Sequence, residues 1–268
     1  MAKDRILFIN QEISPYISAN PISSLGKFLP VSMQEKGFEV RTFMPKFGSV
    51  NERRNQLHEV IRLSGININI DDNDHPLVIK VASLQPARIQ VYFIDNDDYF
   101  QKLESDVNPS GTNRNDNDER TIFFSRGTME TAKKLRWDPK IIHVSGWISA
   151  LIPLYVKRLY NDDLSFKNSK VVYSIQPASD FAPIDPKIFA KLKAEGISQR
   201  DLKKYMTETP DLNLLYKIGV DFAHAVIVND PDIDQELLDY IKATGKPLLM
   251  AQDMELDADK YLEFYNSL

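Results

Sequence analysis

The sequence predicts an α/β fold, a three-layer α/β/α Rossmann-like domain with a mainly parallel sheet. Short apolar segments alternate with helical ones along the chain, the order that builds a parallel sheet with helical crossovers. Three short segments, Ile141–Val144, Val171–Ile175 and Ala225–Val228, are apolar at almost every position. That pattern is typical of strands with helices on both faces. We therefore expect any ligand beyond the carboxyl ends of the strands, at the switch point of the sheet.

The first 45 residues predict a β–α–β unit. Arg5–Asn10 is short and apolar, which indicates a buried strand. Ile22–Lys36 has apolar residues at helical spacing and is followed by Gly37, which favours a helix with a glycine cap. Pro30 within this stretch predicts a kink or a break into two pieces. Glu39–Pro45 predicts the next strand.

Residues 55–95 predict a small β-rich insertion. Four apolar or alternating segments lie between residues 57 and 95, separated by turn signals at Gly65 and at Asp71–Pro76, which favours a meander inserted after the second strand. The polar stretch that follows, about residues 101–117, predicts an exposed and partly mobile loop.

The rest of the chain predicts helices and strands in alternation, within a single domain over residues 1–268. We expect helices at 118–135, 147–160, 186–194, 211–223, 232–243 and 258–266, a charged segment before residue 209, and strands at 141–144, 170–175, 225–228 and 247–250.

Composition excludes several classes of function. The net charge is −5 and no basic cluster stands out in the sequence, so we expect no nucleic acid and no anionic membrane surface as partner. Without cysteine there is no disulfide, thiolate nucleophile or cysteine-bound metal, which fits a cytoplasmic protein. No apolar run approaches the ~18 residues of a membrane span, and the run after Arg5 is too short for a secretory signal.

Phosphate-binding and metal-binding motifs are missing from the sequence. We find no GxGxxG, GxxxxGK[ST], GxSxG or HExxH, and the loop Gln11–Tyr16 after the first strand contains no glycine for close approach to a phosphate. Asp106–Gly111 begins like a calcium loop, but Arg114 and Asn117 stand where ligands are required, which favours a solvated loop. We expect no metal and no cofactor.

The predicted strand ends supply the candidate site residues. His143 either faces the ligand crevice or is a hydrogen-bonded structural histidine, whereas His224 beside an apolar strand is expected to be structural. Trp147 either stacks on a sugar face or belongs to the core. Arg120 either pairs with a crevice carboxylate such as Glu12 or belongs to a helix start rich in capping residues. The loops expected to border the crevice are 11–21, 145–147, 176–182 and 229–232.

Several segments together resemble one family, the bacterial glycogen synthases and plant starch synthases. The similar segments begin RILFINQEISPYISANPISSLGKFLP, VYFIDNDDYF, NDNDERTIFFSRG and NLLYKIGVDFAHA, and they follow the family's order over about residues 5–230. This resemblance implies the N-terminal half of a GT-B glycosyltransferase. For the family it implies transfer of glucose from ADP-glucose to an α-1,4-glucan, with the N-terminal domain supplying much of the glucan surface.

The loops that the resemblance implies for the sugar donor depart from the family pattern. Where the family has Lys-Thr-Gly-Gly-Leu-Ala-Asp, this chain has Ser18 to Ser24, including Asn20, and a serine cannot supply charge to a phosphoryl leaving group. Of the family's His-Ala-His-Asp-Trp-His stretch only His143 and Trp147 remain, and Gln176 replaces the histidine of Thr-Ile-His-Asn. The chain also ends about where the family's donor-binding domain would start.

These departures predict a degenerate, stand-alone domain that lacks catalytic residues and does not transfer glucose by itself. Two alternatives stay open: a glucan-binding or regulatory module, and the acceptor half of a split glycosyltransferase whose donor domain is a separate chain. The expected partners are an α-glucan and either a second copy of the chain, in a homodimer, or a separate glycosyltransferase subunit. The candidates for the ligand crevice are Glu12, Tyr16, Ser18, Asn20, Arg120, His143, Trp147 and Gln176.

Overall fold

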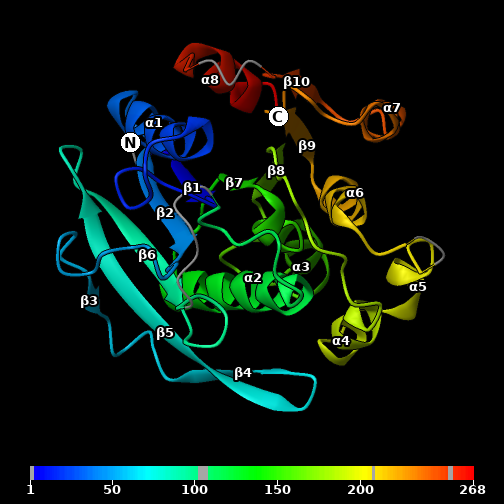
Figure 1. The fold of residues 1–268 in the computed structure, drawn as a ribbon. Helices are drawn as coiled ribbons and strands as arrows, with labels where there is room; N and C mark the ends of the chain where they lie inside the picture. The colour runs from blue at the N-terminus through cyan, green and yellow to red at the C-terminus, as the bar shows by residue number, and fades with distance from the viewer. Residues whose placement is uncertain (1–2, 102–107, 207–208, 253–255) are drawn as a thin grey trace.

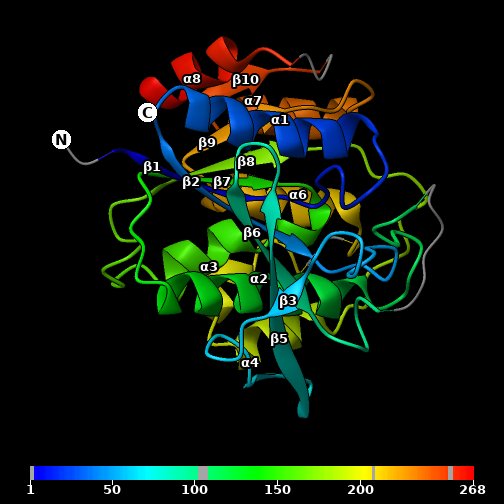
Figure 2. The ribbon, with the colours of Figure 1, turned by 90° about the vertical axis from the view of Figure 1, so that its left-hand side faces the viewer.

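A computed structural model describes residues 3–101, 108–206, 209–252 and 256–268 (Figures 1 and 2). Its strands are β1 (Arg5–Ile9), β2 (Glu39–Pro45), β3 (His58–Glu59), β4 (Ile66–Ile70), β5 (Asn73–Leu84), β6 (Ile89–Asp95), β7 (Ile141–Ser145), β8 (Lys170–Ile175), β9 (Ala225–Val228) and β10 (Leu248–Met250). Its α-helices are α1 (Pro21–Glu35), α2 (Asn117–Lys134), α3 (Ile152–Arg158), α4 (Ile188–Ala194), α5 (Gln199–Leu202), α6 (Leu212–Phe222), α7 (Gln235–Ala243) and α8 (Ala258–Asn266).

The predicted α/β fold is confirmed. The strands lie in the order β10-β9-β8-β7-β1-β2-β6-β5-β3, and those from β10 to β6 are parallel. Helices cover both faces of this sheet: α1 and α8 pack together on one face, and α2, α3 and α6 on the other (Figure 2). Double coverage explains why strands such as β7 and β9 are buried at every residue.

The β-rich insertion forms antiparallel strands, as expected, and these strands extend the main sheet. Strand β6 pairs in parallel with β2, and β5 pairs antiparallel with β6 along seven residue pairs. Of the predicted strand at residues 57–64, only His58–Glu59 forms. The carbonyl of Val60 accepts from the backbone N–H groups of Leu63 and Ser64, so a turn replaces the rest of that strand.

Helix α1 is continuous, so the predicted break at Pro30 does not occur. Pro30 has no N–H to donate to the carbonyl of Gly26, four residues earlier. The side-chain amide of Asn10, from the end of β1, lies 3.5 Å from that carbonyl and donates to it instead. The helix therefore keeps the proline because another element satisfies the acceptor that the proline leaves open.

The helix predicted at 147–160 is also different in the structure. A 3₁₀ turn, Trp147–Ser149, comes first and α3 starts only at Ile152. The hydroxyl of Ser149 donates to the carbonyls of Ser145 and Gly146 at 2.8 and 3.1 Å, and so competes for the acceptors that a regular helix would use. Pro153 then stands in the first turn of α3, a position that tolerates proline.

Two later elements also differ from the prediction. The charged segment before residue 209 contains the short α5. Helix α7 starts later than predicted because Asp234 caps it.

The order of the strands places the switch point between β1 and β7. From β1 the chain proceeds through β2 towards β6, and α2 then returns it to β7 on the other side of β1. Parallel pairing aligns Ile9 of β1 with Val144 of β7, so the loops after these two strands leave the sheet together. This arrangement opens a crevice at the carboxyl edge of the sheet.

We predict that Gly26→Ala destabilises the fold by about 2–3 kcal/mol, an overpacking effect. A Cβ atom on Gly26 would lie 2.1 Å from the carbonyl oxygen of Glu12, and that backbone cannot move without displacing the loop after β1. Urea unfolding followed by circular dichroism measures the effect, with Lys27→Ala on the same helix as the control. Equal unfolding midpoints for the two variants would show that this close contact is unimportant.

Candidate functional site

Two adjoining hollows lie at the carboxyl edge of the parallel strands, and a third continues from them over the antiparallel strands β3 and β5. The first, which we name the crevice, has a volume of about 290 Å³ and is lined by the end of β1, the start of α1, residues 108–112 and the loops after β8 and β9. Of the loops expected at the crevice, 11–21, 176–182 and 229–232 line it, but 145–147 does not. The crevice therefore lies where the sheet topology predicts it.

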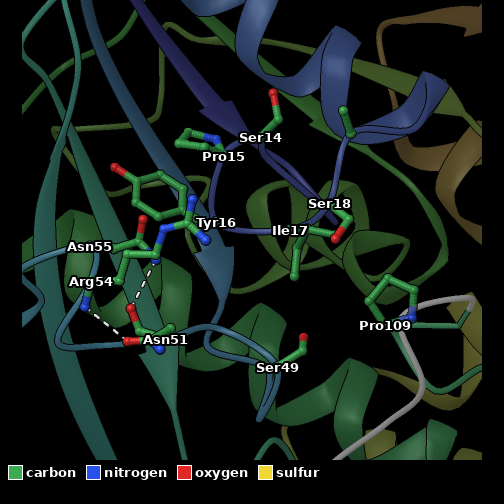
Figure 3. Close-up of a pocket in the computed structure, with 11 residues that line it drawn as sticks. Ser14, Pro15, Tyr16, Ile17, Ser18, Ser49, Asn51, Arg54, Asn55 and Pro109 are labelled. Atoms are coloured by element: carbon green, nitrogen blue, oxygen red, sulfur yellow. Dashed lines mark hydrogen bonds between the residues drawn. The ribbon is translucent and has the colours of Figure 1, made fainter.

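The other two hollows extend from the crevice towards strands β3 and β5, which we call the wing. The Tyr16 hollow, of about 400 Å³, shares Pro109 with the crevice and contains the side chains of Ser14, Ser18 and Arg54 (Figure 3). The wing hollow, of about 480 Å³, shares Tyr16 and Arg54 with it and reaches β3 and β5. We refer to the three hollows together as the groove.

Glu12 is the buried carboxylate of the crevice. Its Oε2 accepts a 2.8 Å hydrogen bond from the side-chain amide of Asn20, and its Oε1 accepts a 3.4 Å bond from Gln11. Within the described residues it forms no ion pair, so the pairing with Arg120 considered from the sequence is not present. Burial raises the pKa of Glu12, although the two hydrogen bonds oppose that shift.

Asn20 also closes the N-terminus of α1. Its Oδ1 accepts from the backbone N–H of Ser23 at 2.8 Å, while the Ser23 hydroxyl accepts from the N–H of Asn20 at 3.0 Å. Pro21, the first residue of the helix, has no N–H, and the N–H of Ser24 donates to the carbonyl of Asn20. The side chains of this loop and the helix itself thus use most of the donors that a helix start offers to an anion.

Tyr16 and Ser18 lie in the Tyr16 hollow, beside the crevice. The ring of Tyr16 packs edge-on against Phe93 with the centroids 4.9 Å apart, and burial raises its pKa to about 12. The carbonyl of Ser18 accepts from the hydroxyl of Ser23. Ser49, in the same hollow, has a buried hydroxyl without a hydrogen-bond partner among the described residues. Sequence reasoning did not select Ser49, because nothing in its local sequence marks it.

Arg120 is a structural residue in this fold. It is fully buried on α2 and donates to the backbone carbonyls of Tyr99, Ser110 and Gly111 at 2.7–3.1 Å, and to Asn117 at 2.8 Å. Its guanidinium therefore fixes the segment that forms one wall of the crevice. Among the described residues, Arg120 thus neither pairs with Glu12 nor lines the crevice, and Asp116 at the N-cap of α2 forms no side-chain capping bond, so the structure shows neither the pairing nor the cap considered from the sequence.

His143 and Trp147 do not face the crevice, contrary to one of the two interpretations from sequence. His143 is buried under α8, where Nδ1 is hydrogen-bonded to the hydroxyl of Tyr265, and burial lowers its pKa to about 3. Trp147 has no exposed surface and packs against Phe181 and the guanidinium of Arg120. Both side chains therefore stabilise the core in this structure.

The ends of the central strands carry polar residues that are largely satisfied by one another. Asn10, after β1, donates to the hydroxyl of Thr42 at 3.0 Å and accepts from the hydroxyl of Ser145 at 3.1 Å.

The loops after β8 and β9 carry two further buried amides. Gln176, after β8, is buried and its Oε1 has no partner among the described residues. Asn229 accepts from Ser174 and donates to Tyr261 of α8. Asn10 and Asn229 were not candidates from sequence, because only the sheet shows their partners.

Metal binding and membrane insertion gain no support from the described parts of the chain. There, no three histidine or acidic side chains gather as metal ligands, and no helix has the length and apolar character needed to cross a membrane. Asp106, the first residue of the calcium-like segment, lies outside the described residues. Asn108 uses its Oδ1 to accept from the N–H of Thr112 at 3.1 Å.

Comparison with known proteins identifies the family. A family model described as the starch synthase catalytic domain matches residues 5–249. The chain belongs to this family. A glycogen synthase of Chlorobium luteolum is 34% identical over 250 residues, which cover 92% of this chain and 50% of that protein. A glycogen synthase of Chlorobaculum tepidum is 35% identical over 238 residues, or 88% of this chain and 47% of that protein. The chain thus spans about half the length of these relatives.

A solved structure shows the same fold. The catalytic domain of starch synthase IV from Arabidopsis thaliana, bound to ADP and acarbose, matches with a TM-score of 0.73 at 15% identity. The match covers 93% of this chain and 51% of that one. The resemblance to the glycogen and starch synthases and the α/β fold expected from it are therefore confirmed.

We predict that Glu12→Gln makes the protein more stable near pH 7, on the order of 1 kcal/mol, because it removes a buried charge without a cation. The raised pKa means that the folded protein keeps this proton at pH values where the unfolded chain has lost it. The contribution of Glu12 to stability therefore falls as pH rises from about 4.3 through the folded pKa. Urea unfolding of both proteins between about pH 4.5 and 7.5 measures the difference, which should shrink towards the acid end.

Glu52→Gln is a control variant for which we expect the opposite change in stability. Burial raises the pKa of Glu52, but hydrogen bonds from Lys80 and Lys46 outweigh it and lower the pKa overall. This variant should lose stability at neutral pH and recover relative to wild type in acid. A Glu12→Gln variant that behaves like Glu52→Gln would contradict the assignment of Glu12 as an uncompensated buried acid.

Proposed function

We propose that this chain binds α-glucan as a domain of the glycogen and starch synthase type and does not by itself transfer glucose from ADP-glucose. The observation that carries the proposal is the closed N-terminus of α1. There Asn20 and Pro21 stand where the family resemblance implies the two glycines of the donor loop. No catalytic residue and no cofactor is assigned to this chain.

The crevice is unfavourable for a nucleoside diphosphate. Diphosphates require backbone donors or cations. Among the described residues that line the crevice, Glu12 is the one ionisable side chain, and its ionised form would repel a phosphate. Ser18 supplies a neutral hydroxyl in place of the cation that the resemblance implies, and the N–H groups of Ser23 and Ser24 in the first turn already donate to Asn20. These features support loss of the donor site.

The groove is better suited to a neutral, hydroxyl-rich ligand. Serines and asparagines supply most of the polar groups of the Tyr16 hollow, and the largely buried Tyr16 forms part of its wall. The buried hydroxyl of Ser49 lacks a partner that a sugar hydroxyl would supply. Arg54 reaches both the Tyr16 hollow and the wing hollow, so it is the cation placed to hydrogen-bond a chain that runs along the groove.

Purified protein supplied with ADP-glucose and glycogen should release no ADP above the blank. We expect no release because the donor loop lacks a cation and the start of α1 is capped. A coupled enzymatic assay for ADP measures the amount released. Clear turnover by the purified chain would overturn this part of the proposal.

A gain-of-function variant tests the same reasoning directly. The triple substitution Ser18→Lys, Asn20→Gly and Pro21→Gly restores a cation and frees helix donors, so ADP affinity should rise about tenfold or more. The Ser18→Lys single variant controls for charge alone. Tight ADP binding by the unmodified chain would contradict the proposed loss of the donor site.

Glycogen should retard the protein in affinity gel electrophoresis, and Arg54→Ala should weaken this effect about threefold or more, as expected for a lost charge-assisted hydrogen bond. The neighbouring Arg53 is equally exposed but lines neither hollow, so Arg53→Ala is a matched control and should migrate like wild type. Unshifted mobility of wild type in glycogen, or the same change in both variants, would argue against the groove as a glucan site.

The proposal extends to location and partners. A glucan-binding domain without its own transfer activity would act in the cytoplasm as a regulatory module, either as a homodimer or beside a separate glycosyltransferase subunit. The acceptor half of a split glycosyltransferase is the alternative assembly. Sedimentation of the chain with and without glycogen tests the homodimer. A homodimer contributes twice the mass of a single chain at every glycogen concentration.

A further inference from the structure

A basic hollow lies at the edge of the sheet opposite the groove. Its walls are the C-terminal ends of α3 and α6 and the short α5, which lies close to α6 (Figure 1). Because α6 leads directly into β9, these helix ends are at the amino edge of the strands, away from the crevice. The hollow has a volume of about 620 Å³, within the size range of small-molecule sites.

Cations dominate the lining of this hollow, although the chain as a whole is acidic. Its two described carboxylates are already engaged: Asp201 accepts from Arg158 at 2.8 Å, and Asp221 binds Lys204 and the hydroxyl of Tyr240. Five cationic side chains line it, namely Lys157, Arg158, Arg200, Lys203 and Lys204.

Three of these five cations are not paired with a carboxylate among the described residues. Lys157, Arg200 and Lys203 are exposed, come from two different elements and form no ion pair among the described residues. Cations at the end of α3 partly serve the helix dipole, but α5 has only four residues, so that explanation does not account for Arg200 within it or for Lys203 and Lys204 directly after it. The surplus positive charge therefore faces the hollow.

Two titratable side chains nearby, the half-buried Lys246 and the more exposed His224, are subject to repulsion from these lysines. Burial, followed by repulsion from Lys157 and Lys204, lowers the pKa of Lys246 to about 8, with only Asp221 opposing it. Burial, and then repulsion from lysines that include Lys157, also lowers the pKa of His224. For both groups burial is the larger cause of the shift in pKa, and the lysines around this end of α6 add to it.

We infer that the basic hollow is a second ligand site, which binds a small phosphorylated molecule. A concave surface with cations from separate elements suits a compact phosphate monoester or diphosphate, which accepts several charge-assisted hydrogen bonds. An acidic protein segment would instead need an extended surface. The buried rings of Phe222 and Tyr205 lie beneath Arg158 and Lys204 and support these two cations at the hollow. The inference is independent of the proposed glucan groove.

Titration calorimetry of the full chain with inorganic pyrophosphate, in about 0.15 M KCl, tests this site at an ionic strength that screens non-specific attraction. Saturable binding is expected. The triple variant Lys157→Ala, Arg200→Ala, Lys203→Ala should weaken it about fivefold or more, since it removes three charge-assisted contacts. Because these side chains are exposed and form no ion pairs, the variant should keep the wild-type melting temperature.

The matched control removes the same number of charges elsewhere. Arg53, Lys167 and Lys193 are also exposed and do not line the hollow, so their joint substitution by alanine should leave pyrophosphate affinity within about twofold. An equal loss in both triple variants, or no saturable binding by wild type, would overturn the site. Tighter binding of a polyglutamate peptide than of pyrophosphate through the same three residues would overturn its assignment to a small phosphorylated ligand.

Discussion

The hydrogen bond between Asn20 and the buried Glu12 is the contact on which the functional edge of this protein depends. It connects the end of β1 with the start of α1, and the same asparagine caps the helix. Gly26 allows the helix to lie directly on the carbonyl of Glu12, and Asn10 satisfies the carbonyl that Pro30 leaves without a donor. The loop between β1 and α1 therefore fixes the position of α1 and of the crevice wall. It also determines which N–H groups at the start of the helix are already hydrogen-bonded.

Under the function proposed above, this loop is where a shared fold differs in the ligand it binds. Packing against the sheet positions α1, whereas a few side chains decide which donors its first turn leaves open. The chemistry at its N-terminus depends on a few side chains. Family membership and the TM-score of 0.73 therefore describe the scaffold, whereas the capped turn describes what the scaffold can bind.

The two edges of the sheet have opposite electrostatic character. At the carboxyl edge, the crevice has one acid and mostly neutral polar groups. At the amino edge, helix C-termini and α5 gather cations around a separate hollow. In an α/β sheet, loops at both edges are free to change while the core holds the strands in place. The basic hollow and the crevice therefore share no lining residue, which is compatible with the separate ligand site inferred above.

The sequence by itself determined the fold class, most helix and strand positions and the family, because these depend on local patterns: apolar strands, helical spacing and caps such as Gly37 after α1. It also placed Glu12, Tyr16, Ser18 and Asn20 in the loop that borders the crevice and the adjoining Tyr16 hollow. Only the tertiary structure decided what the isolated polar residues do. His143 bonds to a tyrosine 122 residues away, and Arg120 donates to carbonyls in a different segment. Contacts between distant segments depend on how helices pack on the sheet, and no periodicity in the chain encodes them.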